Sequence, residues 1–242
     1  MTIIEAHGLA RTFRSRKRTV EAVRGVDLSV AEGEIVGFLG PNGAGKTTTL
    51  RMLTTLLSPT AGTATVAGAD LLADPVGVRR RIGYVPQAIG ATGGGSDPNA
   101  TVAEELTFQA RMYRVPAGEI AARAGRLAAQ LELAGLEDRL VKTLSGGQRR
   151  RLDIALGLVH SPRLVFLDEP THAERCGGVG RRHQRRHRRQ LLAQVVGHRE
   201  RAVPLILDSP GQLHPGRTIG GGRCLDTEAE RMGHRPHANP RR

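Results

Sequence analysis

The sequence contains no tryptophan and few other aromatic residues, two cysteines and no long apolar run. The two cysteines, Cys176 and Cys224, form neither a metal-binding pattern nor a disulfide framework, which favours a reducing, cytoplasmic setting. No apolar segment approaches the roughly 20 residues needed to cross a bilayer, and the N-terminus lacks a secretion-signal pattern. We therefore expect a chain without a membrane span, whose membrane role, if it has one, comes through a partner.

Lysine is absent after residue 171, and the composition changes abruptly there. Residues 172–242 hold 15 arginines against 6 acidic residues, a formal charge of +9, whereas residues 1–171 carry only +4. All aromatic residues precede position 172, and an Arg-, Gly- and Pro-rich tail without them buries too little apolar area to offset its ordering entropy. We expect one domain over 1–171 and a poorly ordered tail over 172–242, with a short helix at 191–196 and a strand at 203–207.

Residues 40–47 read GPNGAGKT and match the phosphate-binding pattern G-x-x-x-x-G-K-[ST] at every fixed position. Glycines let backbone N–H groups converge on an anion, and the following helix adds its positive dipole end. Lys46 is expected to bridge the β- and γ-phosphates, and the Thr47 hydroxyl to hold Mg²⁺. An apolar strand at 34–39 and a helix at 48–57 favour this over a chance glycine-rich turn. The expected nucleotide contacts are Gly40, Asn42, Gly43, Gly45, Lys46, Thr47 and Thr48.

Further strands alternate with helices, which predicts an α/β core. The segment 101–140 instead predicts one helix after another, at 104–113 and 118–133, with Thr101 and Glu104 as a capping box. We expect a helical lobe there, inserted into a core formed by 1–87 and 141–171. The remaining core strands are expected at 3–9, 26–30, 63–66, 82–85 and 164–167.

The apolar strand 164–167 delivers two adjacent carboxylates, Asp168 and Glu169. Consecutive residues of a strand point to opposite sides, so one acid can serve a metal while the next addresses a water molecule. Nucleotide hydrolysis needs both, a Mg²⁺ ligand and a base for the attacking water. An acidic turn after a strand is the simpler alternative, but the phosphate loop upstream favours the chemical interpretation.

Residues 144–148 read LSGGQ and precede a helix expected at 149–160. Ser145 and the glycines could form an anion seat at the helix N-terminus, or Ser145 could be an ordinary N-cap. One nucleotide does not need two separate phosphate-binding sites in the same chain. Two copies arranged head to tail would explain the pair, with each seat closing on the other copy's nucleotide.

LSGGQ followed by LVFLDEP, downstream of GPNGAGKTT, resembles the ATP-binding subunit of an ABC transporter over residues 1 to about 171, in the manner of bacterial drug-exporter and ABC-2 type subunits. The resemblance implies a P-loop NTPase core, ATP and Mg²⁺ as ligands, a homodimer, and a polytopic membrane permease as partner on the inner face of the cell membrane. It makes Asp168 a Mg²⁺ ligand, Glu169 the general base, and Gln87 a residue that touches Mg²⁺ and water. Ser145, Gly146, Gly147 and Gln148 would clasp the partner copy's γ-phosphate. Phe13 takes the place of an adenine-stacking aromatic, although a core role for it is an alternative.

The pattern fails after Thr171. The dimer-contact turn of the family is missing, and the expected strand ending in a γ-phosphate-sensing histidine is not found; His198 and His214 lie in the wrong context. A nucleotide-binding protein without turnover is therefore an alternative function. The total exclusion of lysine after the break suggests a tail read in a shifted frame, and a genuine fused tail is the alternative.

A fused tail could use its RRHQRRHRR run at 181–189 to bind nucleic acid or anionic lipid. No aromatic residue interleaves with the arginines, so base stacking is unsupported and a solvated charge run is the simpler interpretation. We expect no nucleic-acid partner.

Overall fold

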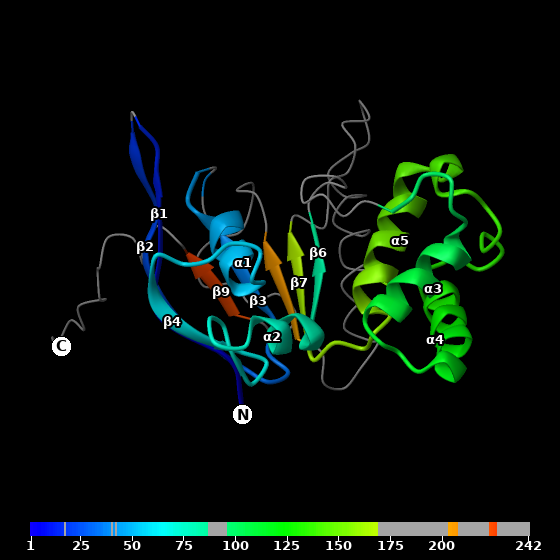
Figure 1. The fold of residues 1–242 in the computed structure, drawn as a ribbon, viewed down its shortest axis with the longest axis horizontal. Coiled ribbons are helices and arrows are strands. Elements are labelled where there is room, and N and C mark those ends of the chain that lie inside the picture. Colours follow the sequence, from blue (N-terminus) through cyan, green and yellow to red (C-terminus); the bar gives the residue numbers. More distant parts are fainter. Residues whose placement is uncertain are drawn as a thin grey trace, which may run out of the picture.

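The structure is a computed structural model, and for residues 203–207 and 223–226 it describes the backbone. The described residues are 1–16, 18–39, 41, 43–86, 96–168, 203–207 and 223–226. Within these ranges no helix is both long and apolar enough to span a bilayer. Figure 1 shows two sheets and a group of helices set to one side of them.

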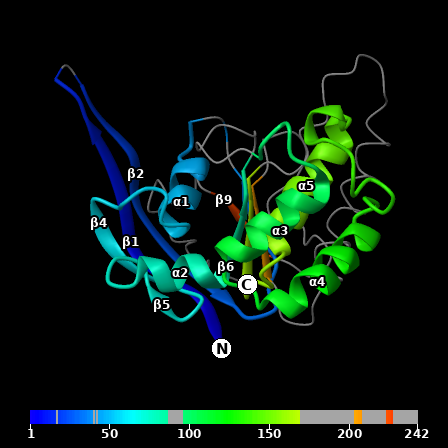
Figure 2. The ribbon, with the colours of Figure 1, turned by 45° about the vertical axis from the view of Figure 1, so that its right-hand side comes forward.

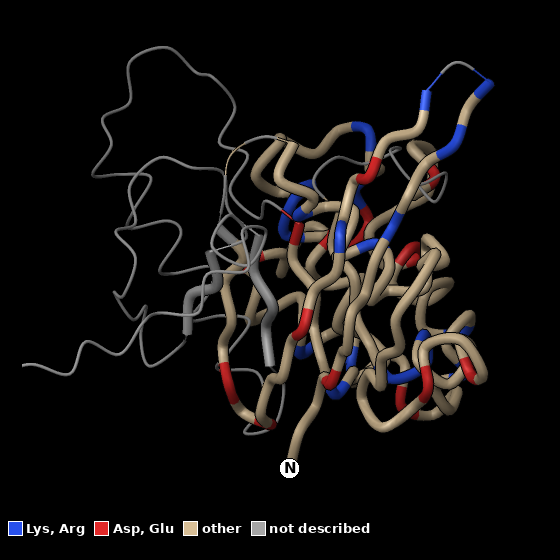
Figure 3. Tube along the Cα trace, turned by 90° about the vertical axis from the view of Figure 1, so that its left-hand side faces the viewer, with Lys and Arg blue, Asp and Glu red and all other residues tan. Residues whose placement is uncertain are grey.

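The first sheet is antiparallel and has the strand order β2-β1-β4-β5. Its long hairpin joins β1 (Thr2–Arg14) to β2 (Thr19–Ala31), paired from Thr2 opposite Ala31 to Arg14 opposite Thr19. Strands β4 (Ala61–Val66) and β5 (Ala69–Asp70) extend it on the β1 side. The hairpin projects beyond the rest of the sheet, and basic residues gather at its tip (Figures 2 and 3).

The second sheet is parallel and has the order β6-β7-β8-β3-β9. Its strands are β3 (Val36–Leu39), β6 (Ile82–Val85), β7 (Leu164–Asp168), β8 (Val203–Leu207) and β9 (Arg223–Asp226). Strands β3, β6 and β7 are short apolar runs, as expected where both faces of a sheet are covered.

Strand β7 separates two hydrophobic cores because its side chains alternate between the faces of the sheet. Leu164 and Phe166 pack in the first core, with the antiparallel sheet and helices α1 (Lys46–Leu53) and α2 (Pro75–Arg81). Val165 and Leu167 pack in the second core, beneath the helical lobe. All four side chains are fully buried.

The helical lobe consists of α3 (Val102–Met112) and α4 (Ala117–Gln130), which pack with α5 (Gly146–Leu158). Thr101 and Glu104 form the predicted capping box at the start of α3. A short 3-10 turn at Val141–Thr143 leads into α5. The prediction of an α/β core with an inserted helical lobe is confirmed.

Several predicted boundaries were wrong. Both strands of the hairpin run well past the predicted 3–9 and 26–30, because each pairs with the other along its whole length through several register shifts. Helix α1 begins at Lys46 and ends at Leu53 rather than spanning 48–57. The Thr54 hydroxyl donates back to the Leu50 carbonyl at 2.9 Å, and Thr55 adopts a left-handed φ of 63°, which ends the helix.

The tail contributes backbone to the parallel sheet. The strand predicted at 203–207 is confirmed as β8, which lies between β7 and β3. Strand β9, which pairs with the other side of β3, was not predicted. The proposed helix at 191–196, the basic run at 181–189 and the two histidines His198 and His214 lie outside the described residues.

Helix α5 crosses β6 at very short range. A Cβ atom built on Gly83 would lie 2.2 Å from the carbonyl oxygen of Gly157, and one on Gly157 would lie 2.9 Å from Val85 Cγ2. Side chains at either glycine would force the helix away from the strand. This pair of glycines therefore sets how closely the lobe approaches the sheet.

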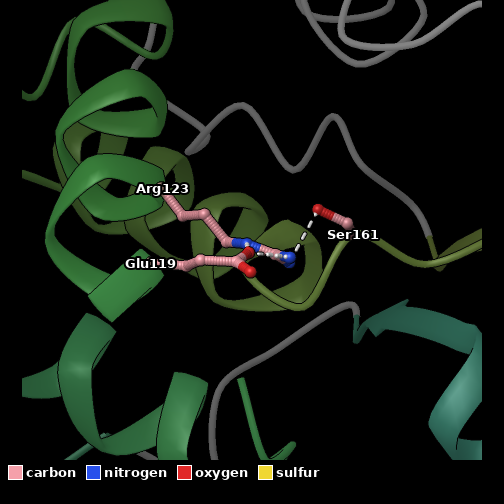
Figure 4. A network of polar contacts seen from close by, with 3 residues as sticks. All are labelled: Glu119, Arg123 and Ser161. Atoms are coloured by element: carbon pink, nitrogen blue, oxygen red, sulfur yellow. Dashed lines mark hydrogen bonds and ion pairs between the residues drawn. The ribbon is translucent and has the colours of Figure 1, made fainter. Parts of the chain in front are cut away.

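Polar contacts fix the lobe to the core beside this crossing. The His160 ring stacks on Tyr113 at a centroid distance of 3.7 Å, and its Nε2 lies 2.9 Å from the Ile82 carbonyl oxygen. A carbonyl only accepts, so Nε2 carries the proton of a neutral ring. Figure 4 shows a second contact, in which Arg123 of α4 binds Glu119 and donates to the Ser161 hydroxyl at 3.1 Å.

Burial of His160 has a consequence for stability at acidic pH. Burial lowers the pKa of His160 from 6.5 to about 4, so the unfolded chain binds the proton first as the pH falls. The free energy of unfolding should therefore decrease as the pH is lowered from about 6.5 to about 4, by up to about 3 kcal/mol from this group. Urea unfolding of the wild type and His160→Gln at several pH values measures the difference.

Asp153, whose pKa burial raises to about 6, contributes the opposite slope in both proteins and cancels in that comparison. Parallel pH profiles for the wild type and His160→Gln would contradict the prediction.

Candidate functional site

The phosphate loop links β3 to α1 through two glycines in left-handed conformations. Gly43 has φ 84° and Gly45 has φ 86°, and Gly45 is the N-cap of α1. A Cβ atom on Gly45 would lie 2.5 Å from the Ala22 carbonyl oxygen, so the loop rests directly on β2. Gly40 and Asn42 lie outside the described residues.

Lys46 is buried at the start of α1, with 6% of its surface exposed. Its Nζ atom donates to the Pro41 carbonyl oxygen at 3.0 Å, so the side chain folds back over the loop. Thr47 and Thr48 follow in the first turn of the helix, half-buried. The ammonium group thus lies where backbone N–H groups and the helix dipole already favour an anion.

Asp168, at the end of β7, is 2% exposed and meets the start of α1. Thr47 Oγ1 lies 3.5 Å from Asp168 Oδ1, although 121 residues separate them in sequence. The Tyr84 hydroxyl donates to Asp168 Oδ2 at 3.3 Å. Burial, and then the nearby Asp168 charge, raise the pKa of Tyr84 to about 12, so the phenol remains a donor.

The pair formed by Thr47 and Asp168 suits a magnesium ion. A hydroxyl and a carboxylate are the hard oxygen ligands that Mg²⁺ takes in proteins, alongside phosphate oxygens. The structure therefore brings together the two described residues that the sequence predicted as metal ligands. Gln87 and Glu169 lie outside the described residues, but the strands that lead to them end side by side, with Val85 opposite Leu167.

Residues 145–148, which we call the signature turn, form the N-terminus of α5. Ser145 Oγ accepts from the Gln148 N–H at 3.3 Å, and Gln148 Oε1 accepts from the Ser145 N–H at 2.9 Å. This capping box confirms the N-cap alternative for Ser145, while Ser145, Gly146 and Gly147 stay exposed to solvent. The exposed N-terminus of α5 is therefore accessible to an anion that approaches from the solvent.

The signature turn and the phosphate loop lie on different parts of the molecule. Figure 1 shows α1 and α5 on opposite sides of β6 and β7, with the turn at the end of the helical lobe.

Phe13 lies near the tip of the β1–β2 hairpin and is 40% exposed, so it is not a core residue. The Arg11 guanidinium covers its ring at 4.7 Å from the centroid. The hairpin also carries Ala22, against which the phosphate loop packs. Phe13 thus presents an accessible aromatic surface on the strand pair that supports the loop, which is compatible with stacking on a base.

Two residues of this region were not predicted from the sequence, Tyr84 and Arg150. Tyr84 could have been found from its place in a strand parallel to the one that ends in Asp168. Arg150 donates to the Pro86 and Asp168 carbonyl oxygens, at 2.5 and 3.4 Å. Nothing in the run of three arginines distinguishes it from Arg149, which pairs with Asp153, or Arg151, which pairs with Glu132.

The close approach at Gly45 gives a stability prediction with a matched control. Gly45→Ala should lower the free energy of unfolding by roughly 2–4 kcal/mol, from left-handed strain and the clash with Ala22. Gly43→Ala has a similar φ but open space around its Cβ position, and should cost only about 1–2 kcal/mol. Urea unfolding measures both, and equal losses would contradict the packing of the loop on β2.

Comparisons with known proteins agree with this geometry. A protein-family model described as "ABC transporter" matches residues 23–172. The ABC transporter ATP-binding protein NatA of Bacillus subtilis is 36% identical over 216 residues, covering 88% of this chain and 86% of that protein. The daunorubicin/doxorubicin resistance ATP-binding protein DrrA of Streptomyces peucetius is 45% identical over 168 residues, covering 69% of this chain. That match spans about half of DrrA, 48% of its length.

A solved structure, the dimeric post-hydrolysis state of the ATP-binding cassette MJ0796 bound to ADP and Pi, shares the fold. The TM-score is 0.68 at 24% sequence identity, over 84% of this chain and 87% of that one. The family model covers more than half of the sequence, and NatA matches nearly the whole of it. This chain belongs to the ATP-binding proteins of the ABC transporter family.

Proposed function

We propose that this chain binds ATP with Mg²⁺ and hydrolyses it as the motor subunit of an ABC transporter, an exporter whose solute passes through a separate membrane permease. The observation that carries the proposal is the meeting of Thr47 and Asp168 at the start of α1, the helix that begins with the buried Lys46. The resistance proteins among its relatives support the direction of transport.

Each residue has a part in the proposed reaction. The loop glycines and Lys46 bind the phosphates, and the Lys46 ammonium moves from the Pro41 carbonyl to a phosphate oxygen. Thr47 and Asp168 would hold Mg²⁺, which would offset negative charge on the phosphates. Gln87 orients the water that attacks the γ-phosphorus, and Glu169 accepts a proton from that water. The bond from this phosphorus to the β–γ bridging oxygen breaks, and ADP leaves with that oxygen. Phe13 stacks on the adenine.

Two copies act together in this proposal. The signature turn of one copy, Ser145 to Gln148, closes on the γ-phosphate held by the other, because α1 and α5 of one chain lie on opposite sides of β6 and β7 (Figure 1). Its exposed glycines and helix N-terminus are chemically suited to an anion. The homodimer therefore completes two identical sites around two nucleotides.

The proposed contact with the permease lies on α3. Phe108 and Met112 are 60% and 66% exposed and lie one helical turn apart. A solvated pair of large apolar side chains on one helix face is typical of a binding surface. We propose that a cytoplasmic segment of the permease covers this pair and holds the chain at the inner face of the membrane.

Nucleotide binding without turnover is a second candidate. The described histidines are His7 and His160; His160 bonds to the Ile82 carbonyl oxygen and stacks on Tyr113. Neither follows a strand of the parallel sheet at its phosphate-binding edge. The same kinetic experiment separates this candidate from the leading one.

Steady-state ATPase activity tests the proposal. Glu169→Gln should lower kcat by 100-fold or more through loss of the base, with ATP still bound. Lys46→Ala should weaken ATP binding by roughly 10- to 100-fold, since hydrogen bonds to charged groups contribute about 1.5–3 kcal/mol. A wild type that binds ATP without turnover would favour the second candidate, and one that does not bind ATP would exclude both.

The permease contact is tested by sedimentation with washed membranes of the source organism. Phe108→Asp and Met112→Asp should reduce the membrane-bound fraction several-fold, while ATPase activity in solution stays unchanged. Leu72→Asp is the control, because Leu72 is 55% exposed but lies outside the helical lobe. Equal loss in all three variants would contradict this surface.

A further inference from the structure

Arg150 connects α5, which begins with the signature turn and is called the signature helix below, to the edge of the parallel sheet. It lies on α5, two residues after Gln148. Its Nη1 atom donates to the carbonyl oxygen of Pro86 at 2.5 Å, and its Nη2 atom donates to that of Asp168 at 3.4 Å. Pro86 directly follows β6, and Asp168 ends β7, the strand that pairs with it. One planar guanidinium group on α5 therefore bridges the ends of two adjacent strands, β6 and β7.

The two carbonyl groups that Arg150 binds directly precede Gln87 and Glu169 in the chain. A peptide unit is planar, so a carbonyl that is held in place also fixes the N–H and Cα of the next residue. The peptide unit that contains the Pro86 carbonyl also contains the N–H of Gln87, and the unit that contains the Asp168 carbonyl also contains the N–H of Glu169. These are the residues to which the proposed function assigns the orientation and deprotonation of water.

Burying the charged side chain of Arg150 costs free energy. Burial lowers the pKa of Arg150, while Asp153 and Asp168 act in the opposite direction. Its Nε atom is buried without a hydrogen-bond partner among the described residues. The two main-chain hydrogen bonds of Nη1 and Nη2 therefore offset only part of the cost of burying this side chain. The rigid fork of arginine donors suits two fixed carbonyl groups, whereas a single ammonium does not.

We propose that Arg150 is a positioning residue that joins the signature helix to the peptide units before Gln87 and Glu169, so that a shift of α5 against the core is transmitted to both. The proposal rests on the proposed function for its link to hydrolysis, but its geometry is testable without turnover. Arg150 binds the Pro86 and Asp168 carbonyl groups and acts through the residues that follow them, Gln87 and Glu169.

Hydrogen–deuterium exchange of the full chain tests the geometry. Arg150→Gln should increase deuterium uptake in peptides that contain residues 86–88 and in those that contain 168–170, because both lose the same clamp. Arg151→Gln is the matched control, since it is the next residue of the same helix and pairs with Glu132 at 2.7 Å. Uptake that is unchanged in either peptide, or equally raised by Arg151→Gln, would overturn the proposal.

Kinetics test the role. Arg150→Gln should lower kcat by about tenfold or more with ATP affinity unchanged within about twofold, because a small misplacement of a reacting group is costly. Arg150→Lys should keep most of the loss, because a single ammonium does not hold both carbonyl groups, and Arg150→Gln should have a smaller effect in a Gln87→Ala background. Unchanged kcat, or a loss of ATP affinity that matches the loss of kcat, would overturn the positioning role.

The two proposals fail in different ways. A wild type that binds no ATP overturns the proposed function, while the exchange experiment still decides whether Arg150 holds the two peptide units. Normal wild-type turnover that is insensitive to Arg150→Gln overturns the positioning role alone.

Discussion

Strand β7 is the element on which the rest of the structure depends. It is buried on both faces, with Leu164 and Phe166 in the core beneath the antiparallel sheet and Val165 and Leu167 in the core beneath the helical lobe. It therefore joins two hydrophobic cores through a single run of five residues. Because both faces are packed, its last residue, Asp168, can occupy only one place, at the edge of the sheet facing α1.

That placement requires a buried carboxylate to be stabilised by its neighbours. An isolated ionised carboxylate in an apolar interior is strongly unfavourable, and it becomes acceptable when donors surround it. Tyr84 supplies a hydroxyl from the adjacent strand, Thr47 supplies another from α1, and Arg150 supplies positive charge. The polar site is therefore assembled from β6, β7, α1 and α5. Tyr84 and α1 pack against the first core, and α5 packs in the second.

The helical lobe is both attached to the core and distinct from it. Gly83 and Gly157 allow α5 to lie almost in contact with β6, and His160 bonds to the same strand through the Ile82 carbonyl. The other end of α5 carries the exposed signature turn (Figure 1). Arg150 binds the edge of the sheet close to that exposed turn, so this end of α5 is suited to link a second copy, in the proposed dimer, to the first copy's site.

The sequence by itself determined the local devices, which are the phosphate loop, the acidic strand end and the capping boxes at Thr101 and Ser145, because each depends on neighbours a few residues apart. It also placed a strand at 203–207, although the composition of the tail argued against order. Only the tertiary structure decided the length of the hairpin, the place of β9, and which of three consecutive arginines reaches the site. Strand pairing and burial depend on residues distant in sequence, and an arginine run has the same local pattern whichever member points inward.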